Sequence, residues 1–246
     1  MGHGSCISER DLDALRRLDT CTVANAIDTF AVRLRNVGFA DARLRCMFED
    51  FPAMVGYAAT ARLRTADPPV AGRVYREHAD WWKSILDIPW PRVVVLTDLD
   101  NPPGRGAFLG DMHTAILRSL GCVGYVTNGA VRELPRVREL GLQVFAGNVA
   151  VSHSYAHIFD FGCAVTVGGL DVRPGDLLHG DRNGLLTVPL EIAGEIPPVA
   201  ARLQQEEQRI MEFCCSRDFS VNGLRQMMDE SKEWQGASRD PEKIGA

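Results

Sequence analysis

The chain has 246 residues, a length that suits one large domain or one domain with terminal extensions. Its apolar content of 46% and charged content of 24% are ordinary for a globular protein. A net charge of −5 gives no basic surface for nucleic acid, and no apolar run approaches the roughly 20 residues of a membrane span. We therefore expect neither nucleic acid nor a membrane as a partner.

The seven cysteines are scattered and include no Cys-x-x-Cys pair, so the spacings typical of zinc sites and thioredoxin-like centres are absent. Cys122 and Cys163 stand in apolar, strand-like contexts and are expected to be small core residues. This usage predicts reduced thiols in a cytoplasmic protein.

The first third of the chain predicts three helices and a strand. Ser8 to Asp11 has the pattern of a capping box, in which side chains satisfy the free amides of a helix start. The following leucines recur at helical spacing. In chain order we expect N-terminal helices within 8–31, a strand over 55–63, and a helix over 78–86 anchored by Trp81, Trp82 and Ile85.

The middle of the chain alternates strands and helices. Residues 92–97 form a continuous apolar run, which is typical of a strand covered on both faces. A loop rich in Gly and Pro follows over 102–110. We then expect a helix over 111–120, a strand over 123–127, a helix from Leu134 to about Leu140 and a strand over 143–146. This order implies a largely parallel sheet with right-handed crossovers.

The second half predicts short strands separated by Gly168-Gly169, Pro174-Gly175 and Asn183-Gly184, a spacing typical of antiparallel hairpins or a small barrel-like layer. A C-terminal helix is expected over about 190–213. The overall prediction is an α/β fold: a single β/β/α domain over 1–218 with a mostly parallel central sheet, flanking helices and the barrel-like layer, followed by a polar tail over 219–246.

Two strand-to-helix junctions in this middle region contain polar residues that could act together. Asp111 follows Gly110 at a predicted helix start, where it could be a plain N-cap. The free amides of Met112 and His113 at that start would also suit a carboxylate ligand.

The second junction holds Arg132 and Glu133, which follow the predicted strand over 123–127. In isolation they could form a local ion pair, or Glu133 could be an acid favoured by the helix dipole. Neighbouring parallel units place such junctions on one rim of the sheet. One carboxylate from each junction could then hold a hard divalent ion, while the guanidinium holds a substrate carboxylate.

Asp111, followed after twenty residues by Arg132 and an acid, resembles the signature of the 4-hydroxy-4-methyl-2-oxoglutarate aldolases. These enzymes belong to the family named for the regulator of ribonuclease activity A (RraA-like). The surrounding sequence is also similar to the family, over 121–132 and 167–189. The resemblance covers roughly residues 18–210 and is specific between 107 and 189.

The resemblance implies a swivelling β/β/α domain, trimers or hexamers with sites between subunits, and a bound Mg²⁺ or Mn²⁺. Members cleave 4-carboxy-4-hydroxy-2-oxo acids to pyruvate and a second oxo acid, and also decarboxylate oxaloacetate. By this resemblance Arg132 would hold the pyruvyl group, Glu133 the metal, directly or through water, and Asp111 a metal-bound water. The helix start after Gly110, with the amides of Met112 and His113, would receive the substrate carboxylate.

The chain departs from the family pattern in one material respect: the aldolases commonly have Asp where this chain has Glu133, so the metal distance could differ by about one C–C bond. A second acid from the final helix of a neighbouring subunit is expected in the family; Glu206 or Glu207 could supply it, or could be solvated helix acids. Trp81-Trp82-Lys83 and the 102–109 loop look like subgroup features that could line a different substrate pocket.

The histidines leave several roles open. His113 could be an accessory acid or a specificity contact. His153 and His157 would share one face of a helix, which allows a zinc pair, a substrate or interface role, or ordinary packing. The Glu of a His-Glu-x-x-His zinc motif is absent. His179, near Asp181 and Arg182, is expected in a structural hairpin network.

The leading hypothesis is a metal-dependent lyase acting on small 2-oxo acids through a pyruvate-type enolate. A Schiff-base route would need an activated lysine, and the two junctions contain none. The alternatives are a non-catalytic binding protein of the ribonuclease-regulator type and an enzyme of related chemistry, such as a decarboxylase or hydratase of a specialised pathway.

Overall fold

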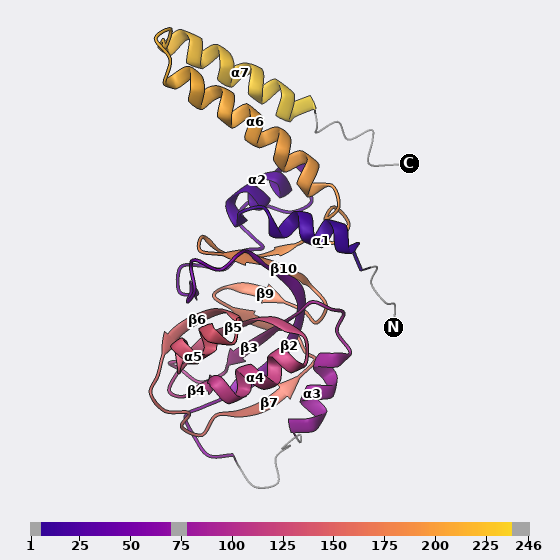
Figure 1. The fold of residues 1–246 in the computed structure, drawn as a ribbon, viewed down its shortest axis with the longest axis vertical. Coiled ribbons are helices and arrows are strands. Elements are labelled where there is room, and N and C mark those ends of the chain that lie inside the picture. The colour runs from indigo at the N-terminus through magenta and orange to yellow at the C-terminus, as the bar shows by residue number, and fades with distance from the viewer. Residues whose placement is uncertain (1–5, 70–77, 238–246) are drawn as a thin grey trace.

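The computed structural model describes residues 6–69 and 78–237, and it has the predicted mixed α/β architecture (Figure 1). A nine-stranded, barrel-like sheet forms the body in the order β1-β6-β5-β3-β2-β10-β11, with β4 added beside β5 and β7 beside β2. The strands are β1 (Arg45–Cys46), β2 (Met54–Arg64), β3 (Arg92–Asp98), β4 (Ala107–Leu109), β5 (Cys122–Val131), β6 (Gln143–Val149), β7 (His157–Phe161), β10 (Leu177–Asp181) and β11 (Gly184–Val188).

The centre of the sheet is parallel, as the alternation of strands and helices predicted. The pairs β2–β3, β3–β5, β4–β5 and β5–β6 run parallel, whereas β1, β7, β10 and β11 are antiparallel to their neighbours. The predicted hairpin layer is also confirmed, as β8 (Val165–Val167) pairs with β9 (Leu170–Val172) in a separate two-stranded sheet.

Both faces of β3 are covered, which explains its continuous apolar sequence. Val94 and Leu96 pack with residues of α3 (His78–Leu86), α4 (Asp111–Ser119) and α5 (Leu134–Glu139). Val93 and Val95 point to the other face, where they pack with the β8–β9 hairpin. Alternate strand residues therefore enter two different cores, as the twofold period of a strand requires.

The N-terminal helices α1 (Glu9–Arg16) and α2 (Thr20–Phe30) close one end of the sheet. The predicted cap is present, because the Asp11 amide donates to Ser8 Oγ at 3.2 Å. His179 is buried on β10, with Nδ1 3.1 Å from Thr20 Oγ1 and Nε2 3.0 Å from the Leu15 carbonyl. It is therefore structural, as expected, although its partners lie in the N-terminal segment rather than within the hairpin.

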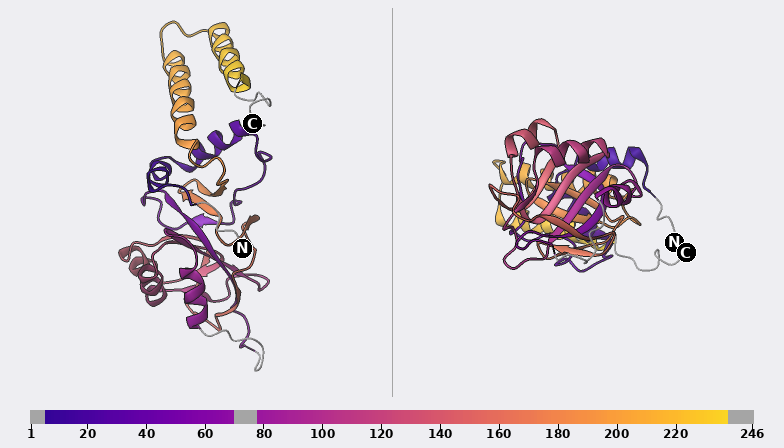
Figure 2. Two further views of the ribbon diagram at one scale, coloured as in Figure 1. Left: turned by 90° about the vertical axis from the view of Figure 1, so that its right-hand side faces the viewer. Right: turned by 90° about the horizontal axis from the view of Figure 1, so that it is seen from below.

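The C-terminal region forms a projecting pair of helices (Figures 1 and 2). Helix α6 (Ile196–Cys214) begins six residues later than expected, because residues 190–195 form turns and a proline pair opens the helix. Helix α7 (Val221–Ala237) lies within the segment expected as a polar tail. Across the described residues, none of the helices combines the length and apolar character needed to span a membrane.

The cysteines agree with the prediction of reduced thiols, because all seven are free. Cys122 is buried, and its burial raises the thiol pKa to about 12. Cys163 is half-buried beside the β8–β9 core. Both therefore serve as packing residues, as predicted.

Candidate functional site

The two predicted junctions lie side by side at the carboxyl ends of β4 and β5. Leu109 of β4 is opposite Val131 of β5, and the Arg132 amide donates a 3.0 Å hydrogen bond to the Leu109 carbonyl. Each strand then leads directly into a helix, β4 into α4 and β5 into α5. The short parallel strand β4, which was expected as loop, is therefore the element that brings the junctions together.

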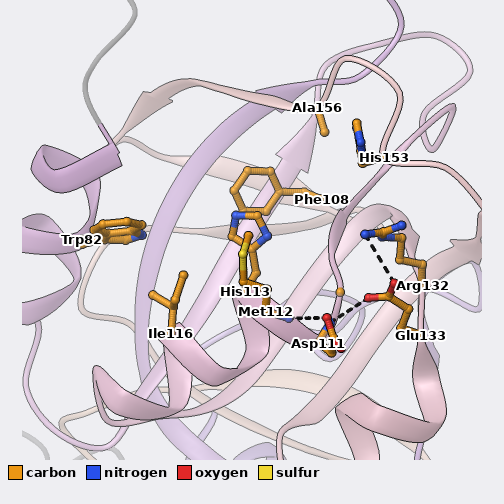
Figure 3. A pocket seen from close by; sticks show the side chains of 11 residues that line it. Trp82, Phe108, Asp111, Met112, His113, Ile116, Arg132, Glu133, His153 and Ala156 are labelled. Carbon is orange, nitrogen blue, oxygen red and sulfur yellow. Dashed lines mark hydrogen bonds and ion pairs between the residues drawn. The ribbon is translucent and has the colours of Figure 1, made fainter.

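The side chains of Asp111, Arg132 and Glu133 converge at this point (Figure 3). The Asp111 amide donates to Glu133 Oε2 at 3.0 Å, and the Met112 amide donates to Asp111 Oδ1 at 2.6 Å. Arg132 Nη2 lies 3.4 Å from Glu133 Oε1. The side chains of Arg132 and Glu133 are 32% and 36% exposed to solvent, so this pair remains open to a ligand.

Local backbone features explain how these groups approach so closely. Gly110, rather than Asp111, is the N-cap of α4, and a Cβ on Gly110 would lie 2.5 Å from Glu133 Oε2. Glu133 is the N-cap of α5 and has φ 57° and ψ 35°, a left-handed conformation that costs a residue other than glycine about 1–2 kcal/mol. Its carbonyl accepts hydrogen bonds from the amides of Arg136 and Val137, which hold this conformation. Strained backbone of this kind is typical of functional sites.

The three groups open into a cavity of about 470 Å³ that has two unlike ends. Asp111, Arg132 and Glu133 form the charged end (Figure 3). Trp82 and Ile116 lie at the opposite end, and Phe108 and His113 lie between the two, with ring centroids 4.5 Å apart. The remaining described lining residues are Gly110, Met112, His153 and Ala156.

A buried network below the site holds the loop that leads to β4. Asp98, at the end of β3, accepts hydrogen bonds from the amides of Gly104 at 2.8 Å and Asp100 at 3.0 Å. The Thr65 hydroxyl donates to it at 3.1 Å. Burial raises the pKa of the Asp98 carboxyl. Asn128 joins β5 to this network, since its Oδ1 accepts from the Asp98 amide at 2.7 Å and its Nδ2 donates to the Asp98 carbonyl.

The structure brings together all six residues expected at the site: Gly110, Asp111, Met112, His113, Arg132 and Glu133. One expected contact is altered, because the Met112 amide, expected to receive a substrate carboxylate, is engaged by Asp111. Glu206 and Glu207 lie on α6 and do not line the cavity in this single chain.

The expectation that His153 and His157 could share a helix face is wrong. His153 lies in a loop and lines the cavity, whereas His157 begins β7. Within the part of the chain that the structure describes, no group of three or more His, Cys, Asp or Glu side chains is arranged to hold a metal. A zinc pair therefore has no support.

Trp82 and Phe108 line the cavity, and both lie in the two segments expected to form a different substrate pocket. Two cavity residues were not anticipated from the sequence: Ile116 and Ala156. Phe108 belongs to β4 and is buried, and Trp81 packs edge-on against it at 5.5 Å. The run of three apolar residues in Ala107-Phe108-Leu109, all of them buried, was the one available signal of a strand there. Ala156 is distant from β4 and α4 in the chain, and it is brought to the cavity by the pairing of β7 with β2 and by the hydrogen bond from the Tyr155 amide to the Thr65 carbonyl.

Comparison with known proteins gives consistent matches. Residues 10–187 match the sequence profile of the RraA-like family, described as Aldolase/RraA. A Halalkalibacterium halodurans protein with the provisional name 4-hydroxy-4-methyl-2-oxoglutarate aldolase is 30% identical over 100 residues, which cover 40% of this chain and 47% of that protein. A protein of Ectopseudomonas mendocina with the same provisional name is 30% identical over 109 residues, 44% of this chain and 66% of its own length. The matched part spans about half to two thirds of these relatives.

Solved structures share the fold. An uncharacterized protein from Pseudomonas syringae pv. tomato has a TM-score of 0.70 at 21% identity, covering 94% of this chain and 98% of its own. Streptomyces coelicolor RraAS2 is described as an unusual member of the RNase ES inhibitor RraA protein family. It has a TM-score of 0.65 at 22% identity, covering 84% of this chain and 98% of its own. At these identities the likeness concerns the fold alone.

Proposed function

Since this chain belongs to the RraA-like family, we propose that it is a divalent-metal-dependent lyase that releases pyruvate from small 2-oxo acids by aldol cleavage or decarboxylation. One observation carries the proposal: a guanidinium and two carboxylates, from Arg132, Asp111 and Glu133, face one open cavity. The provisional aldolase names of the relatives support the same reaction class.

The residues present fit a hard divalent cation such as Mg²⁺ or Mn²⁺. Asp111 and Glu133 offer carboxylate oxygens within one small region, and Mg²⁺ in enzyme sites is usually held by one or two carboxylates, with water and substrate completing its shell. Two protein ligands would therefore suffice. When bound, such a cation would polarise the 2-oxo group and stabilise the negative charge that develops there.

The reaction itself is balanced without any further reagent. In a 4-hydroxy-2-oxo acid the C3–C4 bond breaks and its electron pair remains on C3, which gives the enolate of pyruvate. The C4 hydroxyl loses its proton and becomes a carbonyl, and C3 then takes up a proton. Decarboxylation of oxaloacetate forms the same enolate, with CO₂ as the leaving fragment.

The side chains of the cavity would act on this substrate in distinct ways. Arg132 would bind the C1 carboxylate with its forked N–H groups, displacing part of its contact with Glu133. His113 and His153 are the imidazoles at the cavity, and either could accept or return the proton. None of the described residues at the cavity is a lysine, which favours this route over a Schiff base.

We further propose that the chain assembles as a trimer or hexamer with its sites between subunits. In such an assembly Glu206 or Glu207 of α6 could reach the cavity of a neighbouring copy. The projecting α6–α7 hairpin in Figure 2 supports this idea, because it holds these acids away from the body of its own chain.

The decisive experiment measures pyruvate release from oxaloacetate and from 4-hydroxy-4-methyl-2-oxoglutarate, with Mg²⁺, with Mn²⁺ and with a chelator. Metal-dependent turnover that Arg132→Ala lowers at least about 100-fold would support the lyase. The matched control is Arg136→Ala, because Arg136 lies on α5, pairs with Glu139 and does not line the cavity. Absence of turnover with every metal, together with capture of a ribonuclease complex, would instead support the binding-protein alternative.

A further inference from the structure

We infer that the preferred substrate carries an aromatic group, rather than a second carboxylate, on C4 of the 4-hydroxy-2-oxo acid. This inference rests on the proposed function and adds the substrate class to it. The observation behind it is the division of the cavity into a charged end and an apolar end (Figure 3).

The apolar end is built from side chains of three separate elements. Trp82 comes from α3 and Ile116 from α4, and the ring of Phe108 from β4 adjoins them toward the middle of the cavity. Trp81, which is 1% exposed, packs edge-on against Phe108 and fixes the orientation of that ring. A firmly packed wall of flat and branched side chains is suited to a ring, because aromatic pairs favour tilted and edge-on contacts.

The distribution of charge argues against a dicarboxylate. Arg132 is the one guanidinium among the described lining residues, and it stands beside Glu133 at the charged end. The C1 carboxylate and the 2-oxo group of the substrate would occupy this end. A second carboxylate on C4 would then point toward Trp82 and Ile116, where it would lose water and where the described lining residues offer it no Lys or Arg.

The size of the cavity points in the same direction. Its volume of about 470 Å³ lies within the 300–1,000 Å³ that is common for sites holding drug-sized ligands, well beyond the needs of a three-carbon acid. Among the described lining residues the charged ones lie on one side only, and the remaining space between these residues is bounded largely by apolar atoms. An aryl group attached at C4 would fill that space and bury apolar surface on both partners.

The test uses two substrates that differ only in the group on C4: 4-hydroxy-2-oxo-4-phenylbutanoate, which yields pyruvate and benzaldehyde, and 4-hydroxy-2-oxoglutarate, which yields pyruvate and glyoxylate. We expect kcat/KM for the phenyl substrate to exceed that for the dicarboxylate by at least about tenfold. Trp82→Ala should lower the ratio of kcat/KM for the phenyl substrate to that for the dicarboxylate at least about tenfold. Trp90→Ala is its control, because Trp90 is a half-exposed tryptophan outside the cavity lining.

A charge introduced into the apolar wall should reverse the preference. Ile116→Lys places an ammonium at the position facing the C4 substituent and should raise the dicarboxylate-to-phenyl ratio at least about tenfold. Ala115→Lys adds the same charge one residue away, at an exposed position of α4 outside the lining, and should leave the ratio unchanged.

The outcomes separate the two proposals. Preferential cleavage of the dicarboxylate by the wild-type protein overturns the substrate class and leaves the lyase intact. Absence of pyruvate from both substrates and from oxaloacetate overturns the lyase itself. Inhibition adds a second readout. Phenylpyruvate should bind more tightly than oxalate as a competitive inhibitor, and Trp82→Ala should weaken the binding of phenylpyruvate alone. Equal weakening of the binding of both inhibitors would contradict the inferred contact.

Discussion

The amide nitrogen of Asp111 donates a 3.0 Å hydrogen bond to Oε2 of Glu133, although the two residues are 22 positions apart and belong to different helix starts. This bond links α4 to the N-cap residue of α5, and it orients a carboxylate that also faces Arg132 at 3.4 Å. One Glu133 side chain thus couples both junctions.

Glu133→Gln should abolish metal-dependent turnover while the fold is retained. The side-chain oxygen of the introduced Gln can still accept the hydrogen bond from the backbone amide of Asp111. The substitution removes the negative charge that a hard cation requires. We expect at least a 100-fold loss of kcat/KM, on the order of 3 kcal/mol of transition-state stabilisation, and a higher Mg²⁺ concentration for half-maximal activity. Isothermal titration with Mn²⁺ and steady-state kinetics measure both quantities.

The control for that substitution is Glu139→Gln, since Glu139 is an acid on the same helix α5 that pairs with Arg136 outside the cavity. Wild-type metal dependence in Glu133→Gln would remove Glu133 from the proposed metal site.

Gly110→Ala should disturb the site more than the fold. The added methyl would lie 2.5 Å from Glu133 Oε2 and 3.2 Å from Arg132 Nε, so both side chains must move. We expect kcat/KM to fall at least tenfold, about 1.4 kcal/mol, with a small change in melting temperature. Gly194→Ala is the matched control, because a Cβ there meets nothing closer than 3.5 Å. Full activity of Gly110→Ala would mean that the position of Glu133 is unimportant.

His179 should make stability depend on pH in mildly acidic solution. Burial lowers its pKa below 6.5 in the folded protein, so the unfolded chain binds the proton first as the pH falls. The free energy of unfolding should therefore decrease as the pH drops below about 6.5, by at most about 1.4 kcal/mol per pH unit, and level off below the folded-state pKa.

Urea unfolding at pH 7.5, 6.5, 6.0 and 5.5 measures this slope. His179→Gln should be less stable at pH 7.5, because its hydrogen bonds to Thr20 and the Leu15 carbonyl change, and it should show a flatter slope. His157→Gln makes the same change outside this network and should keep the wild-type slope. An unchanged slope in His179→Gln would assign the acid sensitivity to other groups.

Asp98→Asn should loosen the loop that leads to β4. Its carboxyl accepts hydrogen bonds from the amides of Gly104 and Asp100, and a side-chain amide can supply only one accepting oxygen for them. We expect a loss of about 1–3 kcal/mol in the free energy of unfolding. Hydrogen exchange should be faster at the amides of 104–109, and stability equal to wild type would show that the network contributes little.

Much of the fold follows from local patterns. The period of apolar residues predicts α3 with the observed ends, and the strand–helix alternation predicts the parallel centre of the sheet. These properties depend on neighbouring residues in the chain. The convergence of Asp111, Arg132 and Glu133 was also predicted, from the strand ends of consecutive parallel units. In the structure it is the pairing of β4 with β5 that brings the two junctions together.

The remaining features of the site depend on contacts between distant segments. The pairing of β4 with β5 carries Phe108 into the cavity, and the β2–β7 pairing brings Ala156 and His153 to it. Local sequence does not encode which strand edge a three-residue segment will join, since that choice is made by the burial and hydrogen bonds available in the assembled sheet. The sequence alone therefore identified the charged residues of this cavity and the segments of Trp82 and Phe108, whereas the tertiary structure decided how these residues meet and that Ile116 and Ala156 join them.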